Sequence, residues 1–288
     1  SLANQGGREV TFPDRKPPSV ASYSLAKTYG DLLNQLEEAF NSENPLLRLG
    51  IYYPLYYYKF DKETIDPLAE GRQSQIVGLI RTLLLKRFES SVMAFRSSCE
   101  DLMLKLLYFV ELHNPRTANR WKDQHADLLE MTRQHMVDRG RLVDEEELDE
   151  DIIPEEFKKK IRKLDEKEYN TVEMVLDTML DMEQLARFLY ELTDFEPDHD
   201  DKLQTLLELM KTDPVLSRNK VLIFTEYRDT AVYITEQMEL AGIQPLAEVD
   251  SQSKAGISDT VRAFAPYYNE YSSGELVEEG TQEIRVLV

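Results

Sequence analysis

The segment from Lys220 onwards constrains the fold most, because short apolar runs alternate there with amphipathic stretches. Lys220–Thr225 is a mostly apolar run, typical of a strand that is covered on both faces. Asp229 is positioned to cap a helix that Gly242 ends. This alternation predicts a parallel sheet with right-handed helical crossovers. The later elements that we expect are a strand at Ile243–Val249, a helix at Ser258–Phe264 and a strand at Ile284–Val288.

The third apolar run, Ile284–Val288, lies at the end of the sequence. A buried parallel strand in that position is expected to leave its flank uncovered. We therefore expect the α/β part to be the truncated front of a longer lobe.

Residues 20–215 show helical periodicity almost throughout, with apolar side chains at three- and four-residue intervals. Asn41–Pro45 ends the first helix through turn residues and proline. The junction Glu89–Ser91 contains neither Gly nor Pro, so the pattern permits one continuous helix of about forty residues across it. The helices that we expect are Ser22–Phe40, Ile76–Phe88, Val92–Val110, Ala118–Val137, Val172–Leu189 and one that Asp200 caps. Phe157–Leu164 is a basic stretch directly after an acidic block, and we interpret it as forming ion pairs or a solvated face rather than contacting phosphate.

The chain therefore divides into three expected parts. Residues 1–19, which contain several Gly and Pro, form an extended lead-in. Residues 20–215 form a helical domain, and residues 216–288 form the α/β part. The predicted fold class is a mostly α-helical region followed by a truncated α/β half-lobe with a parallel sheet.

Charge limits the classes of function. The chain has 54 acidic and 34 basic residues and a net charge of −20, which argues against a self-sufficient nucleic-acid binder. One acidic run, Asp144–Asp151, is either a solvated linker or a docking patch for a basic protein partner. No apolar run is long enough to cross a membrane, and Ser1–Asn4 does not begin a secretory signal. We expect a cytoplasmic protein with no membrane partner.

Aromatic residues cluster between Tyr52 and Phe60. Tyrosines can stack on bases, as in single-strand binders. Only one basic residue, Lys59, lies in the cluster, whereas stacking platforms usually accompany a cationic groove. Packing between helices is the favoured interpretation.

The sequence contains no complete catalytic set. It has neither a phosphate-binding Gly-x-x-x-x-Gly-Lys-Ser/Thr loop nor a Gly-x-Gly-x-x-Gly motif. His125 and His135 are about 15 Å apart along one expected helix, too far to share a metal. Asp198–Asp201 is interpreted as helix capping rather than as a cation site, and Cys99 as a buried apolar side chain. We expect no catalytic residue, no metal and no cofactor in the chain itself.

Polar residues follow two of the expected strands. Thr225, Tyr227 and Arg228 come directly after Lys220–Phe224, and Ser253 and Lys254 follow the second strand. In open α/β folds, ligands bind at the carboxyl ends of the strands. Hydroxyls, cations and backbone amides there suit contacts to a phosphate chain.

The same residues carry a family resemblance. Val221–Ala231, the helix to Gly242, a strand ending at Asp250 and Asp259–Phe264 together resemble the opening of the second RecA-like lobe of superfamily-two helicases. The bacterial Swi/Snf-like helicase/translocase group is the most similar. Leu83–Ser91 and Phe12–Arg15 resemble the helical segment between the two lobes of those proteins. The chain departs from the family pattern at Ile257, where arginine is common, and at Ser251, where glycine is frequent.

The resemblance implies a RecA-like half-lobe within a DNA-dependent motor. ATP and Mg²⁺ would bind in the parent protein between this lobe and a first RecA-like lobe located before Ser1. DNA would be a partner through the parent. Thr225, Tyr227, Arg228, Ser253 and Lys254 would be the nucleic-acid-binding residues of this chain.

Two other classes of function remain open. One is a stand-alone acidic helical module that binds a protein partner. The weaker one is a complete α/β-hydrolase-like enzyme, which the missing nucleophile elbow disfavours.

Overall fold

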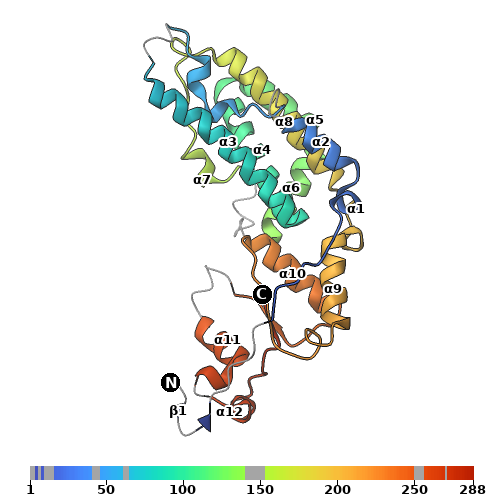
Figure 1. Ribbon diagram of the computed structural model, residues 1–288. Helices are drawn as coiled ribbons and strands as arrows, with labels where there is room; N and C mark the ends of the chain where they lie inside the picture. Colours follow the sequence, from blue (N-terminus) through green and yellow to red (C-terminus); the bar gives the residue numbers. More distant parts are fainter. Residues whose placement is uncertain are drawn as a thin grey trace.

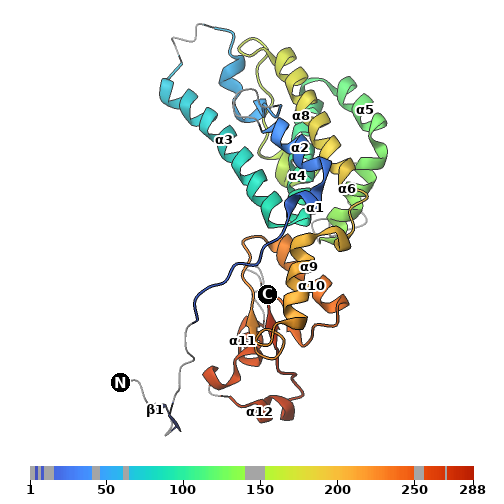
Figure 2. The same cartoon turned by 45° about the vertical axis from the view of Figure 1, so that its right-hand side comes forward.

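The computed structural model describes residues 4–5, 8–9, 16–40, 46–60, 65–139, 153–249, 256–269 and 271–288. The molecule is elongated, with a helical region at one end and a smaller α/β unit at the other (Figures 1 and 2). Two hydrophobic clusters correspond to these parts, one formed by residues between Tyr29 and Leu192 and the other by residues between Leu203 and Val288. The acidic run Asp144–Asp151 lies outside the described residues.

The first expected helix is divided in two. Helix α1 covers Leu25–Tyr29 and helix α2 covers Asp31–Ala39. Gly30 between them has φ of +50°, a left-handed conformation that glycine adopts without steric cost. The prediction of one helix over Ser22–Phe40 is therefore wrong at Gly30.

The two apolar stripes between Ile76 and Val110 form two helices, as predicted, and the continuous helix that the junction permits does not form. Helix α3 ends at Ser90 and helix α4 begins at Val92. Ser91 between them is extended, and its side chain accepts a hydrogen bond from the Ala94 N–H. Serine hydroxyls satisfy the free N–H groups of a helix start in this way, so a serine can restart a helix without Gly or Pro. The two helices are α3, Pro67–Ser90, and α4, Val92–His113.

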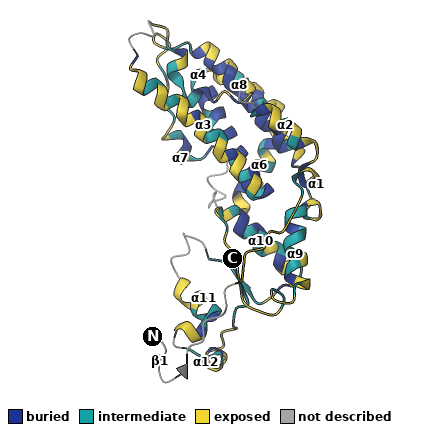
Figure 3. Cartoon of the chain, in the orientation of Figure 1, coloured by how far each residue is buried: buried dark blue, intermediate teal, exposed yellow. Residues whose placement is uncertain are grey.

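Helices α3, α5, α7 and α8 pack against α4, which is buried along most of its length (Figure 3). The helix expected over Ala118–Val137 is two helices, α5 and α6. The basic stretch Phe157–Leu164 is helical only at its start, in α7. Asp200 caps α9 through the Leu203 N–H, as predicted. The elements are α5, Pro115–Gln124; α6, Ala126–Asp138; α7, Glu155–Lys158; α8, Thr171–Glu191; the 3-10 helix η5, Pro197–His199; and α9, Asp201–Thr212.

The aromatic cluster forms two 3-10 helices, η1 at Gly50–Tyr52 and η2 at Pro54–Tyr57. The Tyr57 hydroxyl donates to Asp177 on α8 at 2.8 Å, and the Tyr53 hydroxyl donates to Glu70 on α3 at 2.8 Å. The cluster thus bridges two helices, which confirms the packing interpretation.

Asp181 on α8 holds the start of η1. Its two carboxyl oxygens accept the backbone N–H groups of Arg48 and Leu49, each at 2.6 Å. Leu49 is buried and has φ of +57°, an unusual conformation for a residue with a side chain. The Asp181 carboxyl fixes this conformation by accepting the Leu49 N–H.

The α/β unit contains a small parallel sheet. Its strands are β3, Val221–Leu222; β4, Leu246–Ala247; and β5, Val286–Leu287, in the order β3-β5-β4. Val286 is in register with Val221 on one side and Leu246 on the other. Both edges of β5 are therefore hydrogen-bonded, and the uncovered flank that we expected is not present. The described residues confirm a mostly helical chain with a small three-stranded parallel sheet.

Two details of this unit differ from the sequence predictions. Tyr227, not Asp229, is the N-cap of helix α10, and Asp229 lies in its first turn. Leu222 is 47% exposed and Phe224 is 86% exposed, so the first strand is not covered on both faces. Gly242 follows the helix end with φ of +73°, as its predicted role requires. The helices are α10, Arg228–Leu240; α11, Ile257–Phe264; the 3-10 helix η6, Pro266–Asn269; and α12, Ser273–Glu278.

In the lead-in, Asn4–Gln5 and Arg8–Glu9 pair as antiparallel strands β1 and β2, and residues 16–20 are exposed and without regular structure. Among the described residues, no helix has both the length and the apolar character needed to cross a membrane.

We predict that Asp181 makes stability depend on pH. Burial raises the pKa of this carboxyl to about 7, although the two backbone N–H donors oppose the shift. A raised folded-state pKa means that the stability it contributes is complete below about pH 4 and is lost as the pH rises to about 7. Asp181→Asn removes the titrating carboxyl and one of the two oxygens that accept the backbone N–H groups of Arg48 and Leu49. It should lower the free energy of unfolding by about 1–3 kcal/mol at about pH 5.

The difference in the free energy of unfolding between the wild type and Asp181→Asn should be about 1–2 kcal/mol smaller at about pH 8 than at about pH 5. Urea unfolding followed by circular dichroism at both pH values measures it. Asp198→Asn, at an exposed residue, is the matched control. An equal cost of Asp181→Asn at the two pH values would show that Asp181 does not titrate in this range.

Candidate functional site at the carboxyl edge of the sheet

The carboxyl ends of the three strands meet around a cavity of about 370 Å³. Residues after β3 form one wall, Val249 after β4 forms part of another, and Leu287 and Val288 of the β5 end lie between them. The Val249 N–H donates to the Val288 carbonyl at 2.9 Å, which ties these ends together. This is the edge at which open α/β folds bind ligands.

The structure brings three of the five predicted site residues together at this cavity. Thr225, Tyr227 and Arg228 all line it, with Glu226 between them. Thr225 also lines a second cavity of about 260 Å³, which lies against α9 and α10. Ser253 and Lys254 lie outside the described residues, so their predicted contribution is not placed.

Tyr227 is held by the helical region. The Arg87 guanidinium, on α3, lies 4.5 Å from the centre of the Tyr227 ring, within the range of a cation–π contact. Burial, together with the neighbouring Glu226 carboxylate, raises the pKa of the Tyr227 phenol. Tyr227 is therefore a neutral phenol at physiological pH, and its ring connects the carboxyl edge of β3 to α3.

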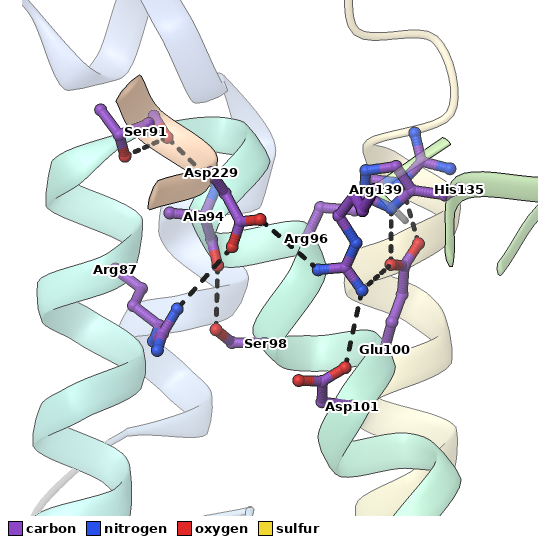
Figure 4. Close-up of polar contacts among 11 residues, drawn as sticks. Arg87, Ser91, Ala94, Arg96, Ser98, Glu100, Asp101, His135, Arg139 and Asp229 are labelled. Carbon is purple, nitrogen blue, oxygen red and sulfur yellow. Dashed lines mark hydrogen bonds and ion pairs between the residues drawn. The ribbon is translucent and has the colours of Figure 1, made fainter. Parts of the chain in front are cut away.

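Asp229 and Thr230, in the first turn of α10, extend this connection. Asp229 lies 4.0 Å from a nitrogen of Arg87 and 3.8 Å from a nitrogen of Arg139, the residue that follows α6 (Figure 4). The Thr230 hydroxyl lies 2.8 Å from the Ser90 hydroxyl and 2.7 Å from the Ser91 hydroxyl. The first turn of α10 is therefore fixed against α3, α4 and α6 by both charge and hydrogen bonds.

Arg139 belongs to a buried charged cluster that the sequence analysis missed. Glu100, on α4, is only 1% exposed and lies 2.6 Å from His135 and 3.0 Å from Arg96. An Arg139 nitrogen lies 3.8 Å from Glu100 and 3.6 Å from Asp101 (Figure 4). The available signal was a spacing of four residues, Arg96–Glu100 and His135–Arg139, which places each pair on one helix face.

Acidic residues at the start of α9 and the single cysteine have structural roles. Asp200 accepts from the Leu203 N–H and from the Tyr233 hydroxyl, so the capping interpretation of Asp198–Asp201 is confirmed for Asp200. Asp201, the first residue of α9, instead pairs with Lys27 and accepts from the Ser24 N–H. Cys99 is fully buried, as predicted, and desolvation raises the pKa of its thiol. Buried thiols with a raised pKa are poor nucleophiles.

His125 and His135 lie in separate surroundings. His125 contacts Tyr190 and Glu183, each at 3.3 Å, whereas His135 contacts Glu100. Within the described parts of the chain, no three His, Cys, Asp or Glu side chains gather as a metal site requires.

The carboxyl edge carries groups that can contact an anionic ligand. It presents the Thr225 hydroxyl, the Arg228 guanidinium and the backbone at the start of α10, groups that suit phosphate oxygens. Comparison of the chain with protein-family models, with curated proteins and with solved structures finds no match. The function is therefore argued from this geometry and from the resemblance of the sequence.

We predict that Arg139 is the residue on which the junction depends most. Arg139→Ala removes the cation that Glu100 and Asp229 share, while Arg96, His135 and Arg87 remain as their other partners, so the expected cost is about 1–3 kcal/mol. Arg116→Ala, at an exposed position of α5, is the matched control and should cost less than about 0.5 kcal/mol. Urea unfolding measures both, and a cost for Arg139→Ala no larger than that of the control would contradict the assignment.

Proposed function

We propose that the chain is the helical region between the two RecA-like lobes of an ATP-dependent DNA helicase or translocase, together with the first part of the second lobe. The bacterial Swi/Snf-like group is the proposed family. The observation that carries the proposal is the position of Thr225, Tyr227 and Arg228 around one cavity at the carboxyl edge of a parallel sheet. These residues belong to the part of the sequence in which the resemblance is strongest.

In this proposal, ATP and Mg²⁺ bind in the parent protein between the two lobes, and the chain itself contributes no catalytic residue. Catalysis there would consist of positioning the phosphates and stabilising their charge from both sides. Thr225, Tyr227 and Arg228 would contact the nucleic-acid backbone, together with Ser253 and Lys254. The RecA-like character of the α/β unit is part of the same proposal.

The junction supports a mechanical role for the helical region. Arg87 contacts both the Tyr227 ring and Asp229, and Ser90 and Ser91 contact Thr230. A segment that touches DNA is thereby attached directly to α3 and α4. We infer that the helical region moves together with the second lobe, because any displacement of Tyr227 would break contacts with α3.

A second candidate function is an acidic helical module that binds a protein partner. The observation that favours it is an apolar stripe on α8, where Val172 is 71% exposed and Leu176 and Leu180 are each 61% exposed. Residues four apart lie on one helix face, and an exposed apolar face of this kind often marks an interaction site. The two functions are compatible if the stripe binds another part of the motor.

The reading frame that encodes the chain tests the proposal most directly. It should contain a phosphate-binding loop before this segment and an arginine-finger element after it. The helicase proposal fails if neither is found, and the interaction-module proposal then stands.

We predict that the chain alone has no ATPase activity and binds duplex DNA more weakly than about 1 µM at physiological salt, because its net charge of −20 repels the phosphate backbone. Fluorescence anisotropy with labelled duplex and a coupled ATPase assay measure the two properties. Sub-micromolar binding, or ATP turnover that is lost in Thr225→Ala, would refute this prediction.

In the intact parent protein, Arg228→Ala should weaken DNA binding evenly across sequences. It should also reduce the slope of log affinity against log salt concentration by about one. Arg218→Ala removes the same charge at the opposite, amino end of β3 and should leave both quantities unchanged. If the two variants behave alike, Arg228 is not a backbone contact.

A further inference from the structure

A cavity of about 390 Å³ lies in the helical region, apart from the carboxyl edge of the sheet. Its walls are α4, the η1–η2 segment, the start of α8 and the stretch from Phe157 to Leu164. Its volume lies within the range of small-molecule sites, about 300–1,000 Å³. None of its lining residues lines the cavity at the carboxyl edge.

The floor of this cavity is apolar and rigid. Phe109, Phe157 and Met174 line it, and all three are buried members of the larger hydrophobic cluster. Ile51 and Tyr52 complete the apolar surface and pack against the same cluster. A surface that is part of the core keeps its shape without a ligand.

The wall from Phe157 to Leu164 is anchored at both ends. Phe157 inserts into the core, and the Leu164 N–H donates to the His113 Nε2 atom on α4 at 3.2 Å. Lys160 and Arg162 lie between these two anchors and line the cavity. Their positions therefore follow from the packing of the segment that carries them.

The three charged residues that line the cavity in the described part of the chain are all cations. They are Lys105, Lys160 and Arg162, and no described aspartate or glutamate lines it, although the chain has 54 acidic and 34 basic residues. The Lys105 ammonium lies 4.5 Å from the centre of the Phe157 ring. Among the described residues, no carboxylate forms an ion pair with Lys160 or Arg162, whereas the neighbouring Lys158 pairs with Glu155 at 2.8 Å. The cavity is thus a local positive site on an acidic molecule.

We propose that this cavity binds a phosphorylated nucleoside, with the base on the apolar floor and the phosphate oxygens on Lys105, Lys160 and Arg162. Ammonium and guanidinium groups are the usual phosphate partners, and the guanidinium can donate two parallel hydrogen bonds. An acidic peptide side chain has no apolar body that would fill the floor. A free nucleotide and a single nucleotide of a nucleic-acid strand share the required chemistry.

Isothermal titration calorimetry of the 288-residue chain with four probes tests the site: ATP, the oligonucleotide dT15, adenosine and inorganic pyrophosphate. ATP or dT15 should bind with a Kd between about 10 µM and 1 mM. Adenosine lacks the phosphates and pyrophosphate lacks the base, so each should bind at least about tenfold more weakly. Tighter binding of ATP identifies the free nucleotide as the ligand, and tighter binding of dT15 identifies a strand.

A pair of double variants localises the binding. Lys160→Glu with Arg162→Glu should weaken binding at least about tenfold, because it places two carboxylates at the phosphate position. Lys159→Glu with Lys163→Glu makes the same change in net charge on the same segment, at exposed residues that do not line the cavity. This control should change the Kd by less than about threefold. Circular dichroism and thermal unfolding establish that both variants are folded.

Three outcomes overturn the proposal. One is the absence of saturable binding of both ATP and dT15 up to about 5 mM. Another is an equal loss of affinity in the two double variants, which would place binding on the general charge of the segment. The third is pyrophosphate binding as tightly as ATP, because the apolar floor would then contribute nothing. None of these results bears on the helicase proposal, which rests on the carboxyl edge of the sheet.

Discussion

The burial of Glu100 in the middle of α4 is the constraint on which much of the structure depends. An isolated carboxylate inside a protein is very costly unless cations and hydrogen bonds compensate it. Arg96 supplies one partner from the same helix, and His135 and Arg139 supply two more from the end of α6. Because Arg139 also faces Asp229, the compensation of one buried charge on α4 draws α6 and α10 to the same place. The helical region and the α/β unit are joined where this cluster lies.

The segment after β3 therefore has two tasks. One side of it, with Thr225, Tyr227 and Arg228, lines the cavity at the carboxyl edge of the sheet. The other side, with Asp229 and Thr230, is bound to α3, α4 and the residue after α6. A ligand at this edge would act on residues that already contact the helical region. These contacts couple the carboxyl edge of the sheet physically to the helical region.

The net charge of the chain conceals the way in which charge is distributed. A net charge of −20 argues against nucleic-acid binding by the surface as a whole. The cavity beside α7 nevertheless gathers Lys105, Lys160 and Arg162, and none of the described carboxylates lines it. Lys160 and Arg162 come from a basic stretch whose sequence suggested ion pairs or a solvated face. Only packing determined that these two residues, and not Lys159 or Lys163, face an apolar floor.

The sequence by itself determined which segments are helices and strands, because apolar periodicity and capping residues act over a few neighbours. It predicted α8 and the Asp200 cap of α9 correctly, together with the alternation of strand and helix after Lys220. It missed the break at Gly30 and left the break at Ser91 open, since a single residue can end a helix whose periodicity continues. Only the tertiary structure decided the strand order β3-β5-β4, the packing of α9 with the α/β unit, and the partners of Glu100. These features depend on contacts between residues far apart in the chain. Local sequence patterns specify that a helix or strand has an apolar or charged face, but they do not specify which other element packs against that face.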